Sequence, residues 1–208
     1  MNKNKMSEKE FTPEQTILKA AKKIFIQKGL DGARMQEIAD EAGINKALLH
    51  YYFRSKDKLF EAIFQDAILK FIPGMMEMLQ SELPLFKKIE IFTGNYIDAF
   101  TENPFIPGFI MHELSRDPSK IAMMVKNSGV RPEAFISQIK KEMEAGSIVE
   151  VDPYHLIVNI LSMCIFPFAA RPILLNVLFR NDPEAYAGFI AQRKKEVPEF
   201  IINAIRKK

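Results

Sequence analysis

Apolar residues recur every three or four positions along most of this chain, which is the spacing of amphipathic helices. The first such segment covers residues 13–28. Thr12 and Gln15 can form a capping box around Pro13, and Gly29 is expected to end the helix. Its predicted apolar stripe contains Ile17, Ala21, Ile24, Phe25 and Lys28. No alternating strand pattern, internal repeat or low-complexity segment is present, so we expect an all-α fold.

Two short helical segments separated by a glycine follow the first helix. Residues 35–41 carry one apolar face, and Gly43 can take the positive φ that a sharp turn between helices requires. Asn45 is a suitable N-cap for the next helix. In that helix we expect Leu48, Leu49 and Tyr52 to face inward, and Lys46, Ala47, His50 and Tyr51 to remain outside. This arrangement predicts a helix-turn-helix whose second helix enters the major groove of DNA.

A fourth helix is predicted to begin after Ser55, its N-cap, and to end near Ile72, before Pro73. Its apolar stripe is wider than a small three-helix head could cover. We therefore expect this helix to begin in the head and to end in a second domain, joining the two. Lys56, near the positive end of this helix, is well placed for a DNA phosphate.

The run IADEAGINKALLHYYFRSKDKLF resembles the signature of TetR-family transcriptional regulators, which reads approximately I-A-x-x-A-G-V-S-x-G-x-L-Y-x-Y-F-x-S-K-x-x-L. Ile44 and Asn45 are near-equivalents of the signature. The matching positions are Ile38, Ala39, Ala42, Gly43, Leu49, Tyr52, Phe53, Ser55, Lys56 and Leu59. The chain departs from the family at Arg34 (usually a capping Thr), Ala47 (Gly or Pro), Leu48 (Thr) and His50 (Tyr). Since three of these lie where the family contacts DNA, the operator sequence cannot be taken from relatives.

The resemblance also implies which side chains contact DNA. Those expected at base edges or the groove floor are Arg34, Gln36, Lys46, Ala47, Leu48 and His50. Those expected at phosphates are Tyr51, Tyr52 and Lys56. For Leu48 and Tyr52, packing within the head is the alternative interpretation.

Charge adds modest support for a polyanionic partner. The net charge is +3, and residues 1–60 hold twelve Lys/Arg against eight Asp/Glu. An ordinary solvated surface would also explain so small a bias. The lysine-rich N-terminus lacks the apolar core of a signal peptide, and the single cysteine, Cys164, excludes an internal disulfide. We therefore expect a cytoplasmic protein.

Prolines and glycines divide the remainder of the chain into further helices, predicted at 84–100, 104–114, 118–127 and 132–145. Two long, apolar helices are predicted to begin at Pro153 and Pro183. The longest stretch free of charged and carboxamide side chains, 160–170, is shorter than the roughly 20 residues that span a bilayer, so no membrane partner is expected. The excess apolar surface of the two helices that begin at Pro153 and Pro183 favours a homodimer through residues 153–207, built as a four-helix bundle. Packing within one subunit is the alternative.

The predicted organisation has three parts: residues 1–11 as a flexible basic N-terminus, 12–58 as the helix-turn-helix DNA-binding domain, and 59–208 as a helical domain for ligand binding and dimerisation. Methionines and aromatic residues are abundant in the last part, where most would be plain core. The family resemblance raises the expectation that some of them line an inducer site. The candidates are Met75, Phe100, Phe105, Phe109, His112, Met124, Cys164 and Phe168.

Catalytic and metal-binding motifs are weak in this sequence. His112 and Glu113 begin like the zinc motif H-E-x-x-H, but Arg116 occupies the second histidine position, so no metal or other cofactor is expected. The sequence therefore predicts a ligand-responsive transcriptional regulator, a repressor that binds palindromic operator DNA as a dimer and is released by a small, largely apolar molecule. The alternatives are a DNA-binding protein without a ligand and an all-α enzyme.

Overall fold

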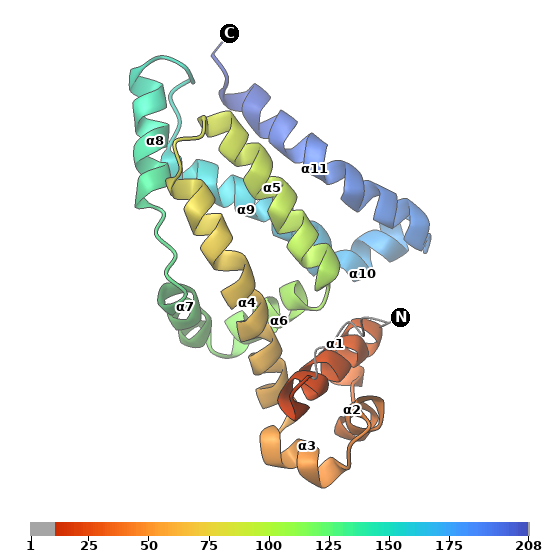
Figure 1. The fold of residues 1–208 in the computed structure, drawn as a ribbon. Coiled ribbons are helices and arrows are strands. Elements are labelled where there is room, and N and C mark those ends of the chain that lie inside the picture. Colours follow the sequence, from red (N-terminus) through yellow and green to blue (C-terminus); the bar gives the residue numbers. More distant parts are fainter. Residues whose placement is uncertain (1–10, 208) are drawn as a thin grey trace, which may run out of the picture. The chain divides into compact units, whose positions relative to one another are not determined.

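The computed structural model describes residues 11–207, in which helices joined by loops are the regular elements and one isolated bridge pairs Ile148 with Arg206 (Figure 1). The all-α prediction is confirmed. The chain divides into two compact units, Met1–Ala67 and Ile68–Lys208. The flexible N-terminus predicted for residues 1–11 lies outside the described residues, except for Phe11.

The first unit contains α1 (Pro13–Gly32), α2 (Met35–Ala42), α3 (Lys46–Tyr52) and the beginning of α4 (Lys56–Gln80). The predicted capping box is confirmed, since Gln15 N donates to Thr12 Oγ1 at 3.2 Å and Thr12 N donates to Gln15 Oε1 at 3.0 Å. Gly29 has a φ of 69° and interrupts the regular helix where the sequence predicted its end.

The core of the first unit combines side chains of α1, α2, α3 and α4, and α1 packs chiefly along α2. The rings of Phe25 and Phe60 meet edge-on with their centroids 4.8 Å apart, and both are fully buried. The predicted stripe of α1 is wrong at Lys28, which is exposed because its ammonium pairs with Glu37. The other buried side chains of this core are Ile17, Ala20, Ala21, Ile24, Ala33, Ile38, Ala39, Leu49, Phe53, Leu59, Ile63 and Phe64.

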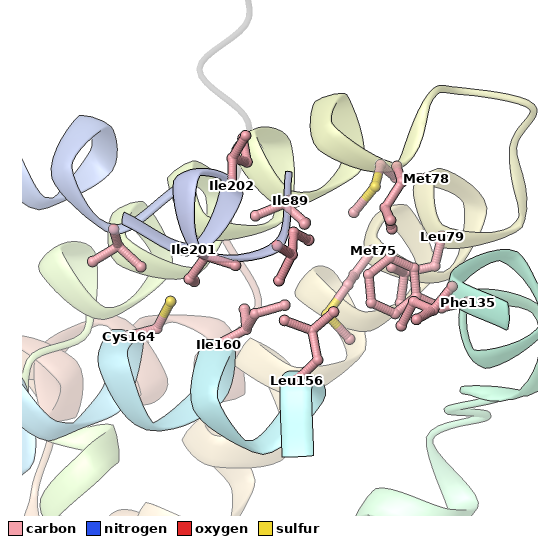
Figure 2. Packing of buried hydrophobic residues seen from close by; sticks show 14 of the residues in the cluster. Met75, Met78, Leu79, Ile89, Phe135, Leu156, Ile160, Cys164, Ile201 and Ile202 are labelled. Atoms are coloured by element: carbon pink, nitrogen blue, oxygen red, sulfur yellow. The ribbon is translucent and has the colours of Figure 1, made fainter. Parts of the chain in front are cut away.

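The second unit contains the rest of α4 and the helices that follow it. These are α5 (Leu85–Glu102), α6 (Ile106–Arg116), α7 (Pro118–Asn127), α8 (Glu133–Glu144), α9 (Pro153–Ala169), the short α10 (Arg171–Ile173), a π-helix (Leu174–Leu178) and α11 (Pro183–Ile205). Helices α5, α9 and α11 pack against one another, α8 packs on α5 and α9, and α6 packs on α7 and α9. Figure 2 shows the central cluster, in which α4, α5, α8, α9 and α11 all contribute side chains.

Helix α4 does not end near Ile72 as predicted but continues to Gln80, with Pro73 inside it. Pro73 and Gly74 are exposed, as is Leu69 one turn earlier, so the missing amide lies on the solvent-facing side of the helix. The opposite side buries Ile72, Met75, Met76, Met78 and Leu79. Burying one such side chain contributes about 1.5–3 kcal/mol, so the set outweighs the roughly 3 kcal/mol cost of an internal proline.

The C-terminal end of α4 is stabilised by a buried lysine. Lys88 of α5 donates from Nζ to the Leu79 carbonyl at 2.7 Å, and a cation there complements the negative end of the helix dipole. Burial lowers the pKa of Lys88, and Glu82 opposes that effect.

The first of the two predicted C-terminal helices is shorter than expected, because α9 ends at Ala169. Pro167 has no amide to donate to the Met163 carbonyl, and Arg193 of α11 donates to that carbonyl instead, at 2.7 Å. Tyr186 of α11 donates to the Pro167 carbonyl at 2.9 Å. Within residues 11–207 no one helix has the length and apolar composition of a membrane span; only Pro153–Ala169 taken together with Arg171–Leu178 has both, across a 59° bend.

We expect Phe60→Ala to lower the free energy of unfolding of the first unit by about 3–5 kcal/mol, because it leaves a cavity against Phe25. Urea unfolding followed by circular dichroism measures this change. Ile26→Ala, at an exposed position of α1, is the control and should stay within about 0.5 kcal/mol of the parent. Equal losses in the two variants would show that Phe60 does not organise this core.

Candidate functional site

A tight turn at Gly43 separates α2 from α3 and changes the direction of the chain. Gly43 has a φ of 67° and its amide bonds the carbonyls of Ala39 and Asp40, which closes the end of α2. Asn45 then accepts a hydrogen bond from Leu48 N at 2.8 Å through its Oδ1 and caps α3. Both features of the predicted helix-turn-helix, the left-handed glycine and the asparagine cap, are confirmed.

Helix α3 is anchored along a single line of its surface. Leu49 is fully buried and Phe53, one turn later, is nearly so. Lys46, Ala47 and His50 are exposed, as predicted. These exposed side chains occupy the side of α3 away from the core of the first unit, so they are free to meet another molecule.

The prediction that Leu48 and Tyr52 face inward is wrong, since they are 36% and 38% exposed. At 100° per residue, a seven-residue helix anchored at Leu49 and Phe53 carries positions 48 and 52 on its flanks. Tyr51 is 79% exposed and its ring meets that of Tyr52 edge-on at 5.4 Å. The outer face of α3 is therefore more aromatic than the sequence pattern predicted.

The beginning of α2 adds two exposed polar side chains beside α3. Arg34 is the N-cap of α2, but its side chain makes no capping hydrogen bond, so its guanidinium is not used at the helix end. Gln36 Nε2 donates to Asp40 Oδ1 at 2.8 Å within α2. Gln36 is therefore engaged within α2, whereas the Arg34 side chain does not cap the helix.

Two basic side chains lie where α3 passes into α4. Lys56 is half-buried and donates from Nζ to the Asp31 carbonyl at 3.2 Å, which leaves two of its three donors for another acceptor. Arg54, in the turn itself, is exposed. Sequence reasoning missed Arg54, although a basic residue directly after the motif was the available signal.

Two ion pairs fasten α2 to α1. Lys28 pairs with Glu37 at 2.8 Å and Lys23 pairs with Glu41 at 2.7 Å. The hydrogen bond from Lys28 holds the pKa of Glu37 below its ordinary value. These pairs neutralise two of the three acidic side chains of α2, Glu37 and Glu41, whereas Lys46 and Arg54 of the α3 region are exposed.

In the second unit, the candidate ligand residues divide into groups. Phe100 of α5 and Phe168 of α9 lie in ring contact at 5.4 Å, and Tyr96 joins them at 4.7 Å from Phe100. The stacked ring of Phe92 and the edge of Phe71 extend this row from Tyr96. The structure thus brings two of the predicted residues together in an aromatic row between α4, α5 and α9.

The other predicted ligand residues are more dispersed. Met75 and Cys164 belong to the central cluster, where Figure 2 shows Cys164 beside Ile201. Phe109 is buried on α6, Phe105 is half-buried just before it, and Met124 is half-buried on α7. His112 is exposed. The predicted set is therefore not one continuous lining.

A polar group interrupts the apolar interface of α5, α9 and α11. Thr93 is fully buried on the same side of α5 as Ile89 and Ile97. Among the described residues, the one group near enough to bond its hydroxyl is the Cys164 thiol, and a thiol forms only weak hydrogen bonds. Burial raises the pKa of Cys164 to about 11, against smaller opposing effects of Thr93 and Arg193. Burial likewise raises the pKa of Tyr96, and the negative charge of Cys164 would add to that shift.

Thr93 and Arg193 were both missed by sequence reasoning. A hydroxyl four residues from an isoleucine on each side was a usable signal for Thr93. Arg193 gave none, because it lies in the run QRKKE, which has the composition of a solvated surface.

The interrupted zinc motif on α6 forms an ion-pair cluster. Glu113 is buried, with His112 Nδ1 at 3.4 Å and Arg116 Nη2 at 3.2 Å from its Oε1. Arg116 thus pairs with the Glu113 carboxylate and occupies the position at which the zinc motif has its second metal-binding histidine. Across the described part of the chain, no three His, Cys, Asp or Glu side chains are grouped to hold a metal ion.

Comparison with known proteins adds independent information. Residues 17–63 match the family described as "Bacterial regulatory proteins, tetR family". The transcriptional activator FasR of Mycolicibacterium smegmatis is 26% identical over 129 residues, which are 62% of this chain and about half (52%) of that protein.

Solved structures share the fold. HlyIIR, a hemolysin II transcriptional regulator, gives a TM-score of 0.60 at 24% identity over 94% of this chain and 98% of its own. The transcriptional regulator FadR of Bacillus subtilis was solved in complex with stearoyl-CoA. It gives a TM-score of 0.63 at 14% identity, over 92% of this chain and 98% of its own. FasR, HlyIIR and FadR are named as transcriptional regulators, not as enzymes.

We expect Asn45→Ala to lower the free energy of unfolding of the first unit by about 1 kcal/mol, since it leaves the Leu48 amide without an acceptor. Urea unfolding provides the measurement. Asn45→Ser, which keeps a good capping oxygen, should retain most of the stability. If the alanine and serine variants were equally stable, the cap would not hold α3.

Proposed function

This chain belongs to the tetR family of bacterial regulatory proteins, and from that premise we propose that it is a homodimeric repressor that binds inverted-repeat operator DNA and is released by a small apolar effector. The observation that carries the proposal is the match of residues 17–63 to the family together with an α3 whose outer face is exposed, basic and aromatic. The DNA-binding domain is proposed for residues 12–58 and the effector and dimerisation domain for residues 59–208.

We assign the exposed face of α3 and the beginning of α2 to DNA contact. Side chains for base edges and the groove floor are Arg34, Gln36, Lys46, Ala47, Leu48 and His50, all exposed. Tyr51, Tyr52 and Lys56 are assigned to phosphates, and Arg54 is added to them. The exposure of Leu48 and Tyr52 favours DNA contact over packing within the head.

The dimer surface is assigned to the C-terminal helices. On α9, Val158 and Phe166 are 57% and 60% exposed, and Tyr154 lies on the same ridge because four-residue steps follow one face of a helix. Ile173, Val177 and Leu178 continue the exposed apolar surface around the bend. A single copy of the chain leaves these side chains in water, whereas a second copy related by a two-fold axis would cover them.

The proposed control acts through α4, which supplies side chains to both cores. Phe60 and Phe64 are buried in the first unit, and Ile72 and Met75 are buried in the second. An effector that displaces the second part of α4 would therefore act on the helix that anchors the DNA-binding head. Two recognition helices must match half-sites one DNA turn apart, about 34–36 Å, so a displacement of a few ångströms is enough to weaken binding.

The direction of regulation is proposed as repression. FasR is named as an activator, so similar proteins can act in either direction. In vitro transcription from the operator-bearing promoter, with and without the protein, decides between the two. Stimulated transcription would replace repression in the proposal and leave the DNA assignment intact.

DNA binding should require an inverted repeat and weaken steeply with salt. On the upstream DNA of its own gene, Lys46→Ala and His50→Ala should change the preferred sequence and cost about 1–3 kcal/mol at the contacted base pairs. Lys56→Ala should weaken binding to all sequences similarly. Electrophoretic mobility shift with a library of half-site variants measures both effects.

Lys195→Ala, an exposed lysine of α11, serves as the control and should bind as the parent does. If Lys46→Ala changed neither affinity nor sequence preference, α3 would not be the recognition helix.

Val158→Asp and Phe166→Asp should each raise the dimer dissociation constant by about two orders of magnitude, because each buries an unpaired carboxylate in the proposed interface. Sedimentation velocity at micromolar concentration measures the change. Met123→Asp, at an exposed apolar position of α7, is the matched control and should leave the oligomeric state unchanged. Dimers that persist in both α9 variants would place the interface elsewhere.

A further inference from the structure

A guanidinium without an acidic partner lies at the interface of α9 and α11. Arg193 is half-buried, its guanidinium carbon stands 5.4 Å from the centre of the Phe189 ring, and Nη2 donates to the Met163 carbonyl. Its Nε is buried and makes no hydrogen bond with any described residue. Among residues 11–207 no carboxylate pairs with it. The half-buried guanidinium therefore keeps its charge and a buried donor, Nε, that an anion can satisfy.

Cys164 directly follows Met163, the α9 residue whose carbonyl accepts from Arg193. The thiol contacts the fully buried Thr93 hydroxyl, and the Arg193 charge also acts on it. Tyr96, about one helical turn after Thr93 on α5, belongs to the aromatic row and is followed in it by Phe100 and Phe168. Arg193 Nε and the Thr93 hydroxyl therefore lie on helices that also contribute to or pack against this aromatic row, which is the composition of a site for an amphipathic molecule.

We propose that Arg193 and Thr93 bind the carboxylate of an apolar monocarboxylic acid whose body lies among Tyr96, Phe100 and Phe168. The inference rests on the proposed function, since it names the chemical class of the effector. A single negative charge fits, because one guanidinium and one hydroxyl in an apolar interface neutralise a monoanion and leave a phosphate dianion undercompensated.

The rings of the aromatic row contact one another, so the acid must part them to enter. This opening reduces the apparent affinity by the fraction of molecules that are open. It also displaces side chains packed beside α4, since Phe71 of that helix meets Tyr96 at 5.6 Å. Acid binding would thereby displace side chains of α4, the helix through which control of DNA binding is proposed.

The alternative role of Arg193 is structural, because it satisfies the Met163 carbonyl that Pro167 leaves without an amide. Pro167→Ala separates the two roles. With alanine at 167, an amide is again available for Met163, and the helix no longer needs the guanidinium. Arg193→Met in that background then removes the proposed anion contact and leaves α9 intact.

The experiment titrates the full-length protein with dodecanoate and with 2-naphthoate, each against its matched alcohol, by isothermal titration calorimetry. At least one acid should bind the parent and the Pro167→Ala variant roughly tenfold or more tightly than its alcohol. That preference should vanish in Pro167→Ala/Arg193→Met and diminish in Thr93→Val. Lys195→Met, which removes an exposed cation two residues from Arg193, should retain it.

The proposal is overturned if neither acid is preferred over its alcohol in the parent, or if the double variant keeps the preference. The two acids distinguish a long-chain effector from an aromatic one. Operator binding is measured separately with and without acid. Acid binding that depends on Arg193 but leaves operator affinity unchanged would sustain this site and reject the proposed control of DNA binding.

Discussion

The structure depends on the apolar side of α4, which is buried in the cores of both units. The same helix buries Leu59, Phe60, Ile63 and Phe64 in the first unit and a methionine-rich set from Ile72 onward in the second. An internal proline would ordinarily end such a helix. It does not do so here because the unmade hydrogen bond lies on the solvent-facing side, where water can replace it, and the apolar side is continuous across the break.

A second constraint comes from the prolines of the C-terminal half. Pro167 deprives an otherwise apolar interface of one backbone donor, and α11 supplies side-chain donors to this region, Arg193 to Met163 and Tyr186 to Pro167. A buried carbonyl without a donor would cost about 1–3 kcal/mol. The fold therefore holds a half-buried guanidinium against two apolar helices without a carboxylate partner, and the proposed acid-binding site rests on that placement.

In the DNA-binding head, burial of only two side chains is enough to hold α3 with its outer face exposed. Leu49 and Phe53 are the residues at which α3 meets the core, and the asparagine cap and the left-handed glycine set its direction. Because one line of contact suffices, the remaining positions of a seven-residue helix are available for recognition. Their identity can then vary without loss of the fold, which accounts for the departures at Ala47, Leu48 and His50 from the family signature.

Local features of the first quarter of the chain were determined by the sequence alone. The capping box at Thr12, the turn at Gly43 and the cap at Asn45 depend on interactions within four residues, so the sequence contains all that is needed to predict them. The all-α class and the starts of most later helices followed for the same reason. The family resemblance rested on the same short segment, which residues 17–63 of the family match include.

Only the tertiary structure decided which residues become neighbours across long separations. The continuation of α4 through Pro73 depends on helices that cover its apolar side, and Lys28 leaves its predicted stripe because Glu37 of another helix attracts it. Leu48 and Tyr52 are exposed because the position of the core, not their hydrophobicity, sets the buried line of α3. In the sequence, Arg193 is one charge in a run with the composition of a solvated surface. In the structure, α9 packs against it and desolvates it, and desolvation is a property of the folded interface and not of the local sequence.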